Sequence, residues 1–159
     1  MTATSSNAQG IDPRGPRFGA TITLIFLTVT LALFLGAQYI AATAVLAYIV
    51  VIFAIGAFAG ISRHPYGYLF KKLVRPRLQP PAELEDVKPP TFAQLIGFVI
   101  TAAGLVFALL GLYPAAIVAV AFAFVAAFLN SVFGYCLGCQ MYVLLARAGI
   151  VGKKASPAS

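Results

Sequence analysis

The only two cysteines of the 159-residue chain lie three positions apart, as Cys136 and Cys139 of a C-x-x-C motif. Residues i and i+3 share a face on a helical turn, so the two sulfur atoms can approach each other. Gly134 and Gly138 give the backbone freedom to close that ring. If a helix begins near Cys136, its N-terminal dipole favours a thiolate there. The motif therefore suits thiol–disulfide exchange, with Cys136 as the attacking thiol and Cys139 as the resolving thiol.

Asn130 is the candidate for a polar group that supports this dithiol. It lies near the end of the last long apolar run, shortly before the motif. An uncompensated amide is unfavourable in lipid, so we expect Asn130 to face another helix. There it either bonds two helices together or places a polar group beneath the dithiol. Arg63 and His64 are candidates for a cation that stabilises the thiolate further.

Two other interpretations of the motif stay open. The cysteines are either inert small residues that pack at a helix end, or metal ligands. His64 is the only histidine, so one chain offers at most three zinc ligands of the Cys and His type, one short of a closed structural site. A zinc ion or an iron–sulfur cluster would have to be shared between copies in an oligomer. We therefore expect no cofactor in the single chain.

The composition places the motif in a membrane protein. Hydrophobic residues make up 61% of the chain and charged residues 9%, against about 25% charged residues in a typical soluble domain. Four uncharged runs reach the roughly 20 residues that a helix needs to cross a bilayer. They are Phe18–Gly36, Ile40–Ile61, Phe92–Gly111 and Pro114–Phe133. The predicted fold is an all-α membrane protein, a single domain whose four transmembrane helices form two tandem hairpins.

The positive charges indicate how these helices are oriented. All 11 basic residues lie before the first run, in the central loop (residues 62–91) or in the tail, and the two short turns carry none. The positive-inside rule therefore predicts that both termini and the central loop are cytoplasmic, in a multi-pass N-in/C-in membrane protein. Because this topology accounts for the net charge of +7, we do not expect nucleic acid as a partner.

The segments outside the spans have their own patterns. Tyr66–Leu78 carries apolar residues at helical spacing with basic residues between them, which predicts a short amphipathic helix on an anionic inner leaflet. The basic residues expected to contact the membrane surface are Lys71, Lys72, Arg75 and Arg77. Residues 134–147 are predicted to form an interfacial segment that carries the C-x-x-C motif. Residues 1–10 are predicted to be a disordered N-terminus and residues 148–159 a flexible tail.

Several short motifs give the chain a resemblance to a known family. They are Asp12-Pro13-Arg14-Gly15-Pro16-Arg17-Phe18, His64-Pro65-Tyr66-Gly67, Arg75-Pro76-Arg77, Pro81-Ala82-Glu83-Leu84-Glu85-Asp86, and Phe128 through Cys139. From roughly Ile11 to Arg147, the chain resembles the domain of unknown function family number 4395, whose members are small, mostly actinobacterial membrane proteins. The resemblance implies that this chain lies in a bacterial inner (plasma) membrane. Members are often associated with thioredoxin-like and rhodanese-like sulfurtransferase proteins, so the resemblance implies such partners. The family supplies no established catalytic residues.

The leading hypothesis is a membrane protein whose cytoplasmic-face dithiol exchanges electrons or sulfur with a soluble thioredoxin-like or rhodanese-like partner. One alternative is a non-catalytic membrane anchor or subunit that recruits a partner through its basic loop. Another is a small permease for a reduced sulfur species. No acidic residue lies in any predicted span, so the usual machinery of a proton-coupled carboxylate transporter is missing. Whether the chain is an enzyme stays open at this point.

Overall fold

The computed structural model describes residues 10–151, and most of these residues are helical. Within it, no strand forms beyond one isolated bridge between Ile11 and Glu85, which ties the N-terminal segment to the central loop. Residues 1–9 and 152–159 lie outside the described range, and with them most of the predicted disordered N-terminus and flexible tail. The prediction of an all-α fold is confirmed.

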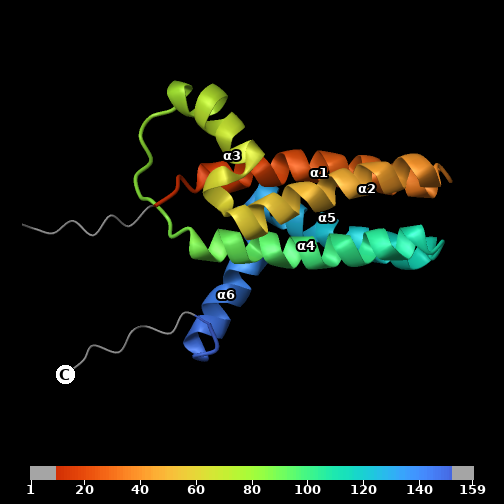
Figure 1. Ribbon diagram of the computed structural model, residues 1–159. Coiled ribbons are helices and arrows are strands. Elements are labelled where there is room, and N and C mark those ends of the chain that lie inside the picture. The colour runs from red at the N-terminus through yellow and green to blue at the C-terminus, as the bar shows by residue number, and fades with distance from the viewer. Residues whose placement is uncertain (1–9, 152–159) are drawn as a thin grey trace, which may run out of the picture.

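The bundle consists of the long helices α1 (Arg14–Leu35), α2 (Tyr39–Ala54), α4 (Lys88–Leu109) and α5 (Tyr113–Phe133) (Figure 1). A π-helical turn, Ile55–Ala59, extends α2. With that turn included, all four helices are long and apolar enough to cross a membrane. The prediction of four membrane-spanning helices in two hairpins is consistent with this arrangement.

Two of the helices begin four residues earlier than their uncharged runs. α1 starts at Arg14 rather than Phe18, and α4 starts at Lys88 rather than Phe92. The first turn of a helix has N–H groups without helical partners, so it accepts proline and charged residues that an apolar run excludes. Pro89 and Pro90 occupy that turn in α4.

The four helices surround one core. α1 packs against α2 and α5, and α4 packs against the same two helices, so α1 and α4 lie diagonally opposite each other. Leu27, Leu46 and Val120 are fully buried at the centre. Thr30 and Thr101 are also fully buried, and each donates its hydroxyl to a backbone carbonyl one turn earlier, at 2.8 and 2.7 Å. These two fully buried hydroxyls are therefore satisfied within their own helices.

The two ends of the bundle differ in charge. At one end lie the two hairpin turns, where the rings of Tyr39 and Tyr113 stack with their centroids 3.8 Å apart. At the other end lie the starts of α1 and α4, the central loop, and α6 (Leu137–Arg147) (Figure 1). Every basic residue in the described range belongs to this second end. The charge separation seen along the sequence is thus a feature of the folded chain.

The central loop begins with a helical segment. α3 (Pro65–Leu69) continues through a π-helical turn, Phe70–Val74, and a 3-10 turn, Arg75–Arg77. The helix predicted over Tyr66–Leu78 is therefore present, but its second half is irregular. Pro76 accounts for part of this irregularity, because it has no backbone N–H to donate.

The apolar face of this segment packs onto α1. Tyr66 and Phe70 are buried there. A β-carbon at Gly15 would lie 3.5 Å from the Phe70 ring, and one at Gly19 would lie 3.6 Å from the Tyr66 side chain. Glycine at these two positions lets the segment approach the α1 backbone closely. The segment is therefore docked on the bundle, with its basic residues exposed.

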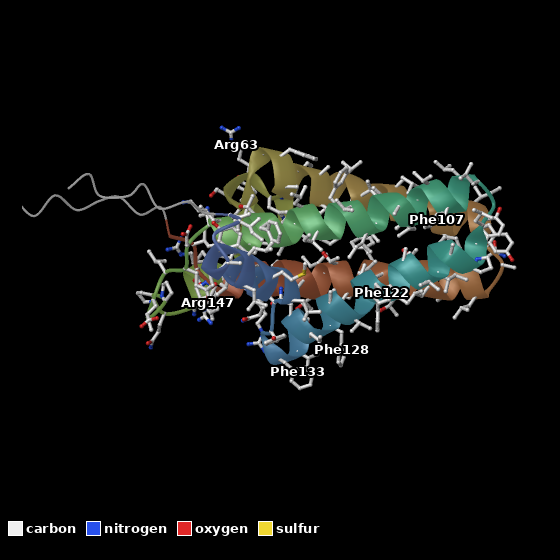
Figure 2. All side chains as sticks on the ribbon, turned by 90° about the horizontal axis from the view of Figure 1, so that it is seen from below. Arg63, Phe107, Phe122, Phe128, Phe133 and Arg147 are labelled. Carbon is white, nitrogen blue, oxygen red and sulfur yellow. The ribbon has the colours of Figure 1, made fainter. Side chains whose placement is uncertain are left out.

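α6 leaves the bundle at an angle (Figure 1). It contacts α4 through Tyr142, whose ring lies 5.7 Å from that of Phe92, and through Gly138, which meets Ala93. Arg147, the last residue of α6, is labelled in the view of Figure 2. The start of α6 is therefore fixed against the bundle, and this start is where the C-x-x-C motif lies.

Candidate functional site

The C-x-x-C motif forms the beginning of α6. Cys136 is the N-cap of this helix, and its Sγ accepts a hydrogen bond of 3.4 Å from the backbone N–H of Cys139. The Cys139 thiol also donates to Cys136, with the two Sγ atoms 2.7 Å apart. This separation exceeds the roughly 2.05 Å of a disulfide bond, so both residues are free thiols. The expectation that a helix begins near Cys136 and brings the sulfurs together is met.

The pKa values of the two thiols are shifted in opposite directions. The hydrogen bond from Cys139, aided by the backbone N–H groups of Gly138 and Cys139, lowers the pKa of Cys136 to about 7. The same bond and burial raise the pKa of Cys139, because its proton is held between the sulfurs. Cys136 is therefore the thiolate of the pair near neutral pH. This asymmetry fits the order expected from the sequence, with Cys136 attacking and Cys139 resolving.

The turn before the motif depends on two glycines in different ways. Gly134 ends α5 with φ of +67°, a left-handed conformation that favours glycine. Gly138 has an ordinary helical conformation, so backbone freedom is not its role. A β-carbon at Gly138 would lie 2.6 Å from both the Cα and the Cβ of Ala93. Gly138 is needed because α6 meets α4 there with no room for a side chain.

Arg17, in the first turns of α1, forms hydrogen bonds with the end of α5. Its Nε donates to the carbonyl of Ser131 at 3.0 Å and its Nη2 donates to the carbonyl of Val132 at 2.8 Å. These carbonyls belong to the last turn of α5, which has no helical donors left for them. The hydroxyl of Thr21 adds a hydrogen bond of 2.8 Å to that of Ser131. Arg17 thereby holds the turn that presents Cys136.

A partly open cavity of about 220 Å³ lies behind Cys136, at the same end of the bundle as the central loop. It is bounded by α1, α4, α5 and the start of α6, and Asn130 and Cys136 both line it, whereas Cys139 does not. The space exists because small side chains build much of the wall. They include Gly19, Ala20, Ala93, Gly97 and Ala126. The structure thus brings Asn130 and Cys136 to the same cavity.

His64 also lines this cavity, but as a neutral side chain. It is 4% exposed, and its Nδ1 accepts a hydrogen bond of 3.3 Å from the backbone N–H of Tyr66. Burial lowers the pKa of His64 to about 4. Arg63 points outward from the bundle (Figure 2). The expectation that one of these two residues supplies a cation to the thiolate was therefore wrong, and the acidity of Cys136 comes from hydrogen bonds.

Gln94 lies beside His64 at the cavity wall. Its side-chain oxygen is close enough to favour a protonated ring, yet it is buried and completes no hydrogen bond in the described part of the chain. A β-carbon at Gly56 would lie 2.7 Å from this oxygen and 2.8 Å from Cδ2 of His64. Glycine at position 56 is what admits both polar side chains. Nothing in the sequence pattern pairs these three residues, which come from three different segments.

The basic residues predicted to contact the membrane surface are grouped elsewhere. Lys71, Lys72, Arg75 and Arg77 are all exposed on the segment that follows α3. Figure 1 places this segment and α6 on opposite sides of the bundle. Lys71 and Arg75 also line a second cavity of about 150 Å³, which shares His64 and Gln94 with the first. The structure therefore does not bring these basic residues to the dithiol.

Side chains of the metal-ligating types do not cluster in the described part of the chain. Across residues 10–151, no three side chains of the His, Cys, Asp and Glu types come together as metal ligands. Cys136 and Cys139 alone supply two thiolates, so the metal alternative requires ligands from a second copy.

Comparison with known families places the chain in one of them. The model of the family described as Domain of unknown function (DUF4395) matches residues 11–147. The chain belongs to this family. The match covers the four long helices, the central loop and α6, including both cysteines, so the dithiol lies within the DUF4395 domain. No curated protein and no solved structure matches the chain.

Proposed function

We propose that this DUF4395 protein is a thiol-exchange protein of the bacterial plasma membrane, whose dithiol passes electrons or sulfur to and from a soluble thioredoxin-like or rhodanese-like protein. The observation that carries the proposal is the pairing of Cys136 and Cys139 at the start of α6, with sulfurs 2.7 Å apart and opposite pKa shifts. A helix N-terminus with one acidic and one protonated thiol is the arrangement that thiol–disulfide exchange uses.

The exchange follows from the roles of the two thiols. The Cys136 thiolate attacks a disulfide of the partner, forming a mixed disulfide and releasing one partner thiolate. Cys139 then attacks the Cys136 sulfur, so a Cys136–Cys139 disulfide forms and the partner leaves with both of its sulfurs reduced. A partner persulfide could likewise pass its outer sulfur to Cys136 and leave as a thiol. Arg17 and Gly138 act as positioning residues, because they hold the turn and the helix start.

Alkylation of the two thiols at different pH values tests this proposal. Cys136 should react with iodoacetamide along a curve with a midpoint near pH 7, since its pKa is lowered to about 7. The thiolate fraction, and with it the rate, should rise as pH rises through that value. Cys139, whose pKa is raised, should stay unmodified over the same range. Mass spectrometry of the two labelled positions in the intact, reduced protein measures both curves, and equal midpoints near 8.5, the ordinary cysteine value, would count against the proposal.

The proposed orientation places the dithiol on the cytoplasmic face. Its support is the gathering of every described basic residue at one end of the bundle, away from both hairpin turns. The reducing cytosol would keep the resting pair as a dithiol. The basic segment after α3 would lie against the anionic inner leaflet.

Labelling in intact cells checks the orientation. In a variant without Cys136 and Cys139, a single cysteine in place of Gln38 should react with a membrane-impermeant maleimide added outside. A single cysteine in place of Glu85 should react only after the membrane is opened. Gln38 precedes α2 at the uncharged end, and Glu85 lies in the central loop. The reverse pattern would move the dithiol to the outer, oxidising face.

A further inference from the structure

The cavity behind Cys136 has the size and lining of a site for a neutral ring. Its volume is about 220 Å³, and an apolar cavity of about 150 Å³ is known to hold a benzene molecule. Phe53, Ile96, Phe122 and Met141 supply apolar surface. None of the described residues that line it is Asp, Glu, Lys or Arg, and His64 is neutral. An anionic sulfur compound would therefore find no compensating charge in this cavity.

The few polar groups of the cavity suit a ligand that changes between hydrogen-bond acceptor and donor. Nδ1 of His64 accepts a backbone N–H, so the ring proton resides on Nε2, which is a donor. The side-chain oxygen of Gln94 lies beside the His64 ring and is a buried acceptor that completes no hydrogen bond of good geometry in the described range, while its NH₂ group can donate. A carbonyl can accept from these donors, and a hydroxyl can donate to the orphaned oxygen. A quinone carries the first group, and its reduced quinol carries the second.

A groove on the outer surface of the bundle continues from the cavity. It runs between α4 and α5, has a volume of about 620 Å³, and its lining is apolar. Ile100 and Phe122 belong to both the groove and the cavity, so the two spaces adjoin. Figure 2 shows Phe107 and Phe122 along this pair of helices. In a bilayer this face meets lipid, which gives an apolar chain a path from the membrane to the cavity.

We propose that the cavity binds the ring of a membrane quinone, with its isoprenoid tail in the α4–α5 groove, and that this quinone accepts the electrons of the Cys136–Cys139 dithiol. The inference rests on the proposed function in the direction in which the Cys136–Cys139 disulfide oxidises a partner dithiol. That exchange leaves Cys136 and Cys139 reduced, and the quinone takes their electrons and restores the disulfide. Cys136 lines the cavity and Cys139 does not, so Cys136 is the sulfur that meets the ring.

The electrons and protons balance in two steps. The Cys136 thiolate adds to a ring carbon, forming a C–S bond and moving an electron pair onto a quinone oxygen. Cys139 then attacks the Cys136 sulfur, so the S–S bond forms, the C–S bond breaks and its electron pair stays on the ring. The two sulfurs lose two electrons to the quinone. The quinone becomes a quinol by taking up the proton of Cys139 and one proton from water, which replaces the proton that Cys136 released when it formed the thiolate.

Anaerobic mixing of the reduced, purified protein with quinones tests the inference. The probes are a dimethoxymethylbenzoquinone with a decyl tail and the same headgroup without a tail. We expect one quinol formed and two thiols lost per chain, measured by absorbance and by thiol labelling. The tailed quinone should react at least ten times faster at low concentration, and Ala103→Phe, which narrows the groove, should remove this advantage.

Two cavity variants locate the binding site. Ala126→Leu fills the cavity and should slow quinol formation at least ten-fold, whereas Val125→Leu, at the exposed neighbouring position of α5, should not. Gln94→Leu keeps the side-chain shape but removes the polar group, and should raise the quinone concentration needed for half-maximal rate. Unchanged alkylation of Cys136 shows that a variant has kept the dithiol intact, and Gln94→Leu carries the test if Ala126→Leu does not fold.

The outcomes separate this inference from the proposed function. Reduction of the quinones at equal rates by wild type and by a variant with both cysteines changed to serine would overturn the inference. Wild-type rates in both Ala126→Leu and Gln94→Leu would also overturn it, because the cavity would not be the site. Capture of a soluble partner on Cys136 without any quinone reduction would leave the proposed function standing and refute the quinone alone. Quinone reduction without capture of a partner on Cys136 would leave the quinone site standing and refute exchange with a soluble protein.

Discussion

Replacing Gly138 with alanine should raise the pKa of Cys136 from about 7 toward the ordinary cysteine value near 8.5. The added Cβ would lie 2.6 Å from the Cα and the Cβ of Ala93, and a backbone atom cannot move aside as a flexible side chain can. α6 would have to shift away from α4, and overpacking of this kind typically costs about 1–3 kcal/mol. The shift would disturb the N-cap hydrogen bonds that stabilise the Cys136 thiolate. The pH midpoint of Cys136 alkylation measures the effect.

Gly67→Ala is the matched control for this substitution. Gly67 also lies in a helix, and a β-carbon there would make only ordinary contacts, the nearest at 3.5 Å. The control should leave the alkylation midpoint of Cys136 near pH 7. If Gly138→Ala leaves it there too, the seating of α6 on α4 is not what makes Cys136 acidic.

The four spans could be predicted from the sequence because their signal is local. Each of the four uncharged runs identifies its helix without knowledge of any other part of the chain. α1 and α4 each begin four residues before their uncharged runs, because Arg14 and Lys88 belong to first helical turns that lie outside the apolar segments. The helix after Tyr66 was also predictable, but its docking through Phe70 onto α1 was not, since amphipathic spacing does not say which surface the apolar face covers.

Only those features of the candidate site that depend on neighbouring residues in the sequence were predictable. The C-x-x-C spacing and the preference for a thiolate at a helix start are local features, and the structure has both. The prediction that Arg63 or His64 supplies a cation to the thiolate was wrong for two reasons. A basic residue at the same end of a bundle need not face the sulfur, as Arg63 shows. A buried histidine loses its charge, as His64 does. Arg17 was seen only as a topology signal, since its contact with the end of α5 joins residues more than a hundred positions apart.

Replacing Cys139 with serine should trap a soluble protein on Cys136. The introduced hydroxyl and the backbone N–H at that position can both still donate to the Cys136 sulfur, so the attacking thiolate is retained, but no thiol remains to resolve the mixed disulfide. The complementary variant, Cys136→Ser, keeps only the cysteine whose pKa is raised and which does not line the cavity. It should trap at least ten-fold less protein at equal abundance.

The most direct test of the account is the identity of the adduct on Cys136 in cells that express the Cys139→Ser variant. Cells are quenched with acid and alkylated, the membrane protein is purified without reductant, and the adduct is released by reduction and identified by mass spectrometry. We expect a soluble thioredoxin-like or rhodanese-like protein, joined through Cys136 and absent from the Cys136→Ser control. Equal adduct on both variants, or none on either while Cys136 alkylates no faster than a free thiol, would contradict an exchanging dithiol.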